Sequence, residues 1–467
     1  MKKIVQLVIV FVAVLTSSCS NYLDIKPYGR TIPKSAEEFS ALLHTHLGRV
    51  DEGTDPVLVG NASQWLTWDA ECGDDFEVCL TASGGQTLKR YVGDLVGSSA
   101  AFNPYRELYQ IIRDCNLVLN EMEESGTKQA NEVLATAYAM RGVAYYQLMR
   151  MYCEAPQAGN LANQLGLPLV TEFDMEAKPK RSTLQQTVDL IEDDLKESLK
   201  YRMNEPVYRF TEEVVKGYLA RLYFWTQAWD QALPLAQEIL NKHPLLAGEA
   251  YAKMMSSVYS LGGNQLLKAY RSVSTSGNQG LTGINKTIKT RPVSRRLLAN
   301  FREGEKDIRY QLWADKKRQV TKVFFCGMRA AEFKLIEAEC YYHLKQHDQA
   351  LQAINELRAH RIADYTYLTA EELPAPLASE IIQVDALGQP LSPLLSLILT
   401  ERRKELFLEG DRFFEQKRNG TPEFWTAYNG RKYVTQSFMY TLPIPITNIN
   451  IVDKLVQNPG YTEIKSN

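Results

Sequence analysis

Apolar residues recur at intervals of three and four along most of this chain, which is the spacing of helices with one buried face. The run 182–200 shows the pattern most clearly, because five apolar residues fall on one side of the helix that it predicts: Leu184, Val188, Ile191, Leu195 and Leu199. Ser182, with Gln185 three residues later, predicts a capping box at the start of that helix. Similar spacing predicts helices over 105–122 and 132–152. The pattern indicates a mainly α-helical protein.

Two segments of the chain look alike. Residues 217–240 and 331–358 each predict a helix, a short polar turn and a second helix, and both contain Asp-Gln-Ala-Leu, at Asp230 and Asp348. Small residues in them allow paired helices to approach closely: Ala220, Ala232, Ala338 and Ala350. The pattern is similar to the tetratricopeptide repeat. The copies lie too far apart for a regular array, and chance likeness between two amphipathic hairpins is the alternative.

Three stretches interrupt the helical pattern with Gly, Ser, Asp or Pro. They cover residues 51–103, 244–292 and 371–393. Within the second, the apolar run 266–270 predicts a short strand. Long irregular segments on a rigid scaffold usually carry binding function, so we expect ligand contacts there.

The first residues have the form of a bacterial lipoprotein signal. Lys2 and Lys3 precede an apolar run over 4–15, which is too short to span a bilayer, and small residues lead to Cys19. This predicts a signal peptide over 1–18 and lipid attachment at Cys19, with an ordinary secretory signal as the alternative. No later segment of the sequence reads as transmembrane.

The amino-acid composition bears on three questions: nucleic-acid binding, disulfide bonds and metal sites. The 467 residues are 45% hydrophobic with a net charge of −2, which gives no electrostatic reason to expect nucleic acid. Cys72 and Cys79 are close enough to pair in an exported protein, whereas Cys115 and Cys340 lie in helical patterns that favour free buried thiols. No cysteine has the spacing of a metal site, so we expect no metal and no cofactor.

Nothing in the sequence predicts an enzyme. No Gly-x-Ser-x-Gly or metal-protease motif occurs. A glycoside hydrolase needs two carboxylates at a fixed separation, but with 55 acidic residues some pair can always be proposed, so such pairs carry no weight.

The run 401–418, ERRKELFLEGDRFFEQKR, mixes charged and strongly apolar residues. Its leucines and phenylalanines demand burial, and a lone buried charge is very costly, so its charged side chains must be paired. We expect them to hold helices together without doing chemistry: Glu401, Arg402, Glu405, Glu409 and Arg412.

The same run resembles the C-terminal signature of the SusD/RagB family of Bacteroidetes lipoproteins, with Glu415-Gln416 where members usually carry Asp-Leu. Further blocks resemble the family in order along the chain: 21–24, 141–156, 166–170, 329–361, 442–445 and 457–461. The resemblance implies a helical scaffold of tetratricopeptide-like pairs with a loop-rich ligand-binding half and a few short strands. It implies one SusD-like domain over 19–467, with an N-terminal region of about 19–230 and a C-terminal region of about 250–467.

The resemblance also implies a function. Family members are outer-membrane lipoproteins that bind a nutrient, usually an oligosaccharide, and deliver it to a SusC-like TonB-dependent transporter without catalysis. The expected location is therefore the outer membrane, facing the cell surface. Peptide binding, as in the RagB branch, and a purely protein-binding tetratricopeptide scaffold are the alternatives.

A sugar site needs exposed aromatic faces beside polar side chains. Trp65 and Trp68, with Asp74 close by, are the first candidates, and core positions for both indoles are the alternative. The secondary candidates lie in the same irregular stretches: Tyr91, Tyr270, Arg271 and Asn278.

Overall fold

The structure is a computed structural model. It describes residues 33–55, 58–62, 68–69, 72–77, 104–172, 174, 176, 178–259, 261–271, 282, 292–428 and 431–461. Within these ranges most residues are helical, and the strands form three two-stranded antiparallel sheets. The mainly α prediction is therefore confirmed.

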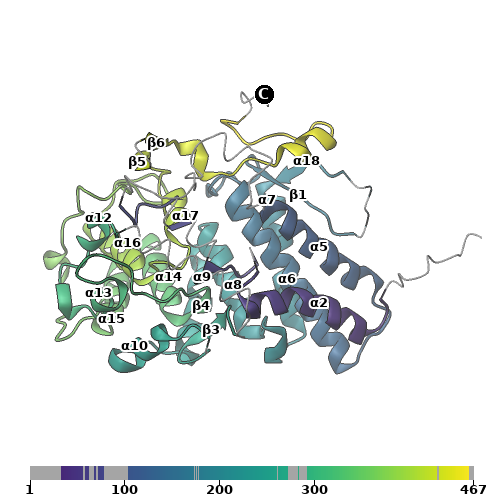
Figure 1. Cartoon of the computed structure of the whole chain (residues 1–467), viewed down its shortest axis with the longest axis horizontal. Helices are drawn as coiled ribbons and strands as arrows, with labels where there is room; N and C mark the ends of the chain where they lie inside the picture. Colours follow the sequence, from purple (N-terminus) through teal and green to yellow (C-terminus); the bar gives the residue numbers. More distant parts are fainter. Residues whose placement is uncertain are drawn as a thin grey trace, which may run out of the picture.

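The N-terminal half is a layer of long helices on one side of the molecule (Figure 1). Its helices are α2 (Ala36–Glu52), α5 (Pro104–Glu121), α6 (Lys128–Tyr152) and α7 (Leu184–Lys200). Helix α6 lies at the centre of the layer, packed between α5 and α7 and also against α2. Most of its residues are buried, as the Ala- and Tyr-rich sequence requires.

Helix α7 begins one residue later than the sequence predicts. The N-cap is Thr183, whose side chain pairs reciprocally with Gln186, and not Ser182 with Gln185. Ser182 lies in β2 (Arg181–Thr183), which pairs with β1 (Leu165–Pro168). Because the strand continues to Thr183, the chain is still extended at Ser182 and the helix starts after Thr183.

The two similar segments form the predicted helix pairs. They are α8 (Glu212–Trp225) with α9 (Trp229–Lys242), and α14 (Ala330–His343) with α15 (His347–Ala359). The four matched alanines are all fully buried, and α14 packs on both α9 and α15. Each turn contains a residue with positive φ three places before its Asp-Gln-Ala-Leu, Gln227 at 65° and Lys345 at 64°. The shared turn geometry extends the likeness from the sequence to the backbone.

The remaining elements are shorter and lie mainly in the C-terminal half. The helices are α10 (Gly248–Ser256), α12 (Arg295–Leu298), α13 (Ile308–Trp313), α16 (Pro393–Glu405), α17 (Arg412–Arg418) and α18 (Ile446–Ile451). The 3₁₀ turns are η2 (Pro206–Tyr208), η3 (Gly304–Lys306), η4 (Ala370–Glu372) and η5 (Ser437–Tyr440). The strands are β3 (Gln265–Lys268), β4 (Gly327–Arg329), β5 (Phe424–Tyr428) and β6 (Arg431–Thr435).

These elements correct one prediction and confirm another. The stretch 244–292 is not wholly irregular, because α10 lies in it with Tyr251, Met254 and Met255 buried. The short strand expected over 266–270 is confirmed as β3, which pairs with β4.

A single large apolar cluster runs from α2 to the C-terminal segment and so joins the two halves. The C-terminal segment crosses back over the N-terminal helices, where α18 lies near β1 and α7 (Figure 1). There the Leu442 amide donates to the Met151 carbonyl at 2.8 Å, and the Asn458 side-chain amide donates to the Tyr152 carbonyl at 2.8 Å. The blocks 442–445 and 457–461 thus hold the C-terminal segment against the end of α6.

Candidate functional site

A buried ion-pair network surrounds the end of α16. Glu405 receives Arg329 at 2.6 Å, Arg361 at 2.9 Å and Arg309 at 3.1 Å, and these four side chains are at most 1% exposed. Burial alone would raise the pKa of Glu405. The three guanidiniums have the larger effect, and they hold the pKa of Glu405 well below the usual range. The arginines come from α13, β4 and the segment after α15, so this carboxylate ties three elements to α16.

The neighbouring acids of the motif are paired in the same way. Glu401 contacts Arg309 at 2.6 Å and Lys404 at 2.7 Å, and also Arg358. Glu409 contacts Lys322 at 2.6 Å and also accepts from Arg329. Buried charges of both signs therefore alternate through the junction between α13, α14, α15 and α16.

A second part of the network joins 72–77 to α16 and α17. Arg412 donates to Asp74 at 2.7 Å, and Arg403 contacts Asp75 at 2.8 Å. The cations outweigh the burial that would otherwise raise the pKa of Asp74, and they lower it. The two residues that depart from the family pattern both lie here, because Glu415 accepts from Arg412 at 2.9 Å and Gln416 donates to Asp74 at 2.7 Å.

Two groups near the network have pKa values close to neutrality. Burial raises the pKa of Glu415 to about 7 and lowers that of Lys417 to about 7. The Lys417 ammonium donates to the Arg150 carbonyl at 2.7 Å and to the Cys153 carbonyl at 2.5 Å. Both side chains thus form hydrogen bonds within the protein. These bonds favour a role in joining helices over a role in acid–base chemistry.

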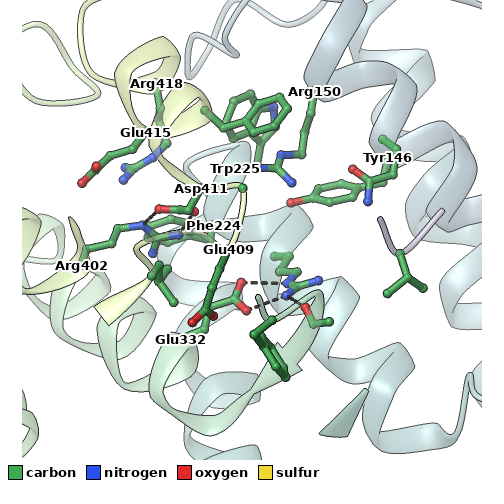
Figure 2. Close-up of a pocket in the computed structure, with 18 residues that line it drawn as sticks. Tyr146, Arg150, Phe224, Trp225, Glu332, Arg402, Glu409, Asp411, Glu415 and Arg418 are labelled. Atoms are coloured by element: carbon green, nitrogen blue, oxygen red, sulfur yellow. Dashed lines mark hydrogen bonds and ion pairs between the residues drawn. The ribbon is translucent and has the colours of Figure 1, made fainter. Parts of the chain in front are cut away.

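A cavity of about 60 Å³ lies beside this network, between α6, α8, α14 and the segment that leads into α17. Figure 2 shows Arg150 and Tyr146 extending into it from α6, opposite Arg402 and Asp411. Arg402 binds Asp411 through two nitrogens, at 2.6 and 2.8 Å. Arg221 and Glu332 form a similar two-bond pair on another wall, at 2.6 and 2.8 Å.

The structure places three of the predicted ligand residues in the core. Trp68 is 2% exposed and stacks on Phe413 with ring centroids 4.9 Å apart. Asp74 belongs to the ion-pair network described above. The Tyr270 hydroxyl is buried and accepts from the Ala62 amide at 2.9 Å. Their contact with a ligand stays a prediction.

The other predicted ligand residues are separated from these. Arg271 is half-buried, and burial together with the nearby Arg209 guanidinium lowers its pKa. The remaining predicted positions lie outside the described residues: Cys19, Trp65, Tyr91 and Asn278. The structure therefore brings Asp74 to the motif residues but does not gather the predicted ligand residues into one site.

The thiols in the described ranges are buried. Cys115 and Cys340 are free, as their helical positions predict, and so are Cys153 and Cys326. Cys72 is also buried, while Cys79 lies outside the described residues. Among the described residues, no group of three or more His, Cys, Asp or Glu side chains is placed to hold a metal ion.

Trp425 is an exposed aromatic residue that the sequence did not lead us to predict. Trp425 on β5 is 57% exposed, whereas the other tryptophans in the described part of the chain are at most 8% exposed. It pairs across the hairpin with Val434, which is 42% exposed, and the Lys432 ammonium lies 5.3 Å from its ring. The signal was present in the sequence, because aromatic and β-branched residues flank Asn429-Gly430, a dipeptide that favours hairpins.

Comparison with known proteins identifies the fold and the family models that match. A family model described as "Starch-binding associating with outer membrane" matches residues 21–224, and the SusD family model matches residues 306–461. No curated protein matches the chain. In the described part of the chain, no helix is both long and apolar enough to cross a membrane.

Solved structures match over almost the whole length. A SusD superfamily protein from Bacteroides thetaiotaomicron has a TM-score of 0.69 at 20% identity, covering 91% of this chain and 100% of that one. A SusD-like carbohydrate binding protein from Bacteroides vulgatus gives 0.66 at 18% identity, with 91% and 98% covered. A laminarin binding SusD-like protein gives 0.60 at 15% identity, with 92% and 100% covered.

Proposed function

This chain belongs to the SusD family, and from that premise we propose that it is a cell-surface lipoprotein that binds a glycan and delivers it to a SusC-like TonB-dependent transporter. The anchor is a lipid on Cys19, and the delivery partner is a barrel in the same outer membrane. The protein binds its ligand and does not change it.

The observation that carries glycan binding is the position of Trp425. An indole that is 57% exposed on a hairpin is an apolar platform of the kind on which the C–H face of a sugar packs. Lys432 is itself exposed, and its cation–π contact with the ring is worth only about 0.5–1 kcal/mol, so a sugar can displace it at small cost. Val434 extends the apolar surface beside the indole.

Four predicted ligand residues remain as proposed contacts besides Trp425. Trp68, Asp74 and Tyr270 already pack or pair within the protein, so exposing them to a sugar would cost core contacts. We therefore place the further contacts at Trp65, Tyr91, Arg271 and Asn278.

Affinity electrophoresis of the protein starting at Ser20 tests glycan binding. The panel includes starch and laminarin, and peptide binding is measured in parallel by calorimetry. Retardation by a glycan is expected. Binding to peptides alone would contradict the proposal and favour a peptide importer, and binding to neither class would favour a protein-binding scaffold.

Single substitutions then locate the contact. Trp425→Ala and Trp65→Ala should each weaken retardation, whereas Tyr367→Ala should leave it unchanged. Tyr367 is a matched control because it is also aromatic and 49% exposed. Retardation of Trp425→Ala equal to wild type would remove the hairpin from the site.

The anchor and its orientation have their own test. Protease treatment of intact cells should digest the wild-type protein, and Cys19→Ala should release it from the membrane fraction. Complete protection in intact cells would contradict the surface location.

A further inference from the structure

Arg150 differs from the other arginines around the cavity of Figure 2. Its guanidinium lies 3.8 Å from the centre of the Phe414 ring and 5.5 Å from those of Trp225 and Tyr146. The three rings hold the charge by cation–π contacts. Within the described structure no carboxylate forms an ion pair with it, and its Nε is buried without a hydrogen-bond partner.

The carboxylates of the cavity wall are already used by other cations. Asp411 is held by Arg402, Glu332 by Arg221, and Glu409 by Lys322 and Arg329. The fourth, Glu415, accepts from Arg412 through Oε2, while its Oε1 is buried without a partner. Arg150 adds to the field that lowers the pKa of Asp411, but no hydrogen bond joins the two.

The cavity wall also presents other donors without acceptors. Arg402 is 5% exposed, and its Nη1 is buried with no partner although its other two donor nitrogens bind Asp411. Trp225 is 4% exposed, and its indole N–H is likewise unpartnered. Buried donors without acceptors are costly, and here two of them share a small cavity with an uncompensated guanidinium.

We propose that this cavity binds one small monovalent inorganic anion of the size of chloride, held by Arg150, Arg402 Nη1 and the indole N–H of Trp225. Each group is a donor or a cation, and together they lack an acceptor and a negative charge. The cavity volume of about 60 Å³ accommodates a halide or a few waters, at about 10–15 Å³ for each water. The anion would link α6 to the segment that leads into α17.

A ligand that binds only the folded state raises its unfolding temperature. Wild-type protein is therefore unfolded in sodium gluconate and in sodium chloride or bromide at equal ionic strength. Gluconate is a much larger anion than a halide and carries its charge on a carboxylate, so exchange to 100 mM halide should raise the unfolding temperature by about 1–3 °C. The shift should be absent in Arg150→Gln and present in the matched control Arg302→Gln, which also removes one positive charge but lies exposed and away from the cavity.

Two results would overturn the proposal. One is a wild-type unfolding temperature that does not respond to halide, which would mean that the cavity holds only water. The other is a halide response that survives in Arg150→Gln. If that variant does not fold, anomalous diffraction from wild-type crystals soaked in bromide decides: a peak within hydrogen-bond reach of Arg150 supports the site, and an empty cavity overturns it.

Discussion

Two neighbouring segments of the chain differ in which kind of side chain they bury and which they expose. Along α16 and α17 the charged side chains are buried, with Lys404 and Glu405 fully so, while a few residues later Trp425 stands 57% exposed on β5. A reading based on hydropathy alone would have placed the charges outside and the indole inside. Burial here follows whether a side chain has a partner within the protein.

The difference separates structural residues from candidates for function. A buried charge is tolerated only when it is paired, so the charged residues of α16 and α17 have a structural role within the fold. Trp425 makes only a weak contact with Lys432 inside the protein, so most of its indole face is available to a ligand outside the chain.

The largest expected effect comes from breaking the charged segment. Glu405→Gln leaves Arg309, Arg329 and Arg361 without their shared carboxylate, and we expect a loss of about 3–5 kcal/mol in the free energy of unfolding. Urea denaturation followed by tryptophan fluorescence measures it. Glu371→Gln, at an exposed position on η4, is the control and should stay within about 0.5 kcal/mol of wild type. A similarly small change in Glu405→Gln would mean that the network contributes little to stability.

Acid should weaken the same segment. Glu339 accepts from Arg418, which together with His343 lowers its pKa from 4.5 to about 2. Because the folded pKa is depressed, this contribution of about 3 kcal/mol is present above pH 4.5 and is lost as the pH falls toward 2. The difference in unfolding free energy between wild type and Glu339→Gln should therefore shrink from pH 6 to pH 2.5. A constant difference would contradict the assigned ionisation.

Glu415 should give a dependence of the opposite sign and of similar size. Its folded pKa is raised to about 7, mainly by burial, so the folded state binds the extra proton between pH 4.5 and 7. Its contribution to stability therefore falls as the pH rises through that window, by about 3 kcal/mol. Glu415→Gln should lack this fall in urea titrations at pH 5, 6, 7 and 8. If the variant kept the wild-type slope, another group would be responsible.

The smallest effect on stability is expected at the hairpin. Trp425→Ala removes an exposed side chain, so the free energy of unfolding should change by no more than about 0.5 kcal/mol. Urea denaturation of Trp425→Ala and Glu405→Gln under the same conditions compares their losses in free energy of unfolding directly. A loss of several kcal/mol would show that the indole stabilises the fold, and the contrast between the segments would disappear.

The sequence predicts the scaffold because its signals are local. Helical spacing sets α5, α6 and α7, and repeated Asp-Gln-Ala-Leu marks the two helix pairs. The need to pair charges in 401–412 also follows from the sequence, since leucines and phenylalanines surround them. Their partners do not follow, because Asp74, Arg309 and Arg329 come from distant segments with no common spacing.

The candidate site was harder to predict for the same reason. Trp68 and Trp425 look alike in sequence, as each is an aromatic residue in a polar stretch. Only the folded chain brings Phe413 and Phe414 against Trp68 and leaves Trp425 in solvent. Whether a tryptophan is buried in the core or exposed to a ligand depends on contacts between segments hundreds of residues apart. The spacing of apolar residues along the sequence does not predict such contacts.

The most direct test is a calorimetric titration of Trp425→Ala with the glycan that retards the wild-type protein, beside a urea unfolding curve of the same preparation. We expect an affinity at least about tenfold weaker, equivalent to about 1.4 kcal/mol, with an unchanged unfolding curve. Wild-type affinity in the folded variant would contradict it.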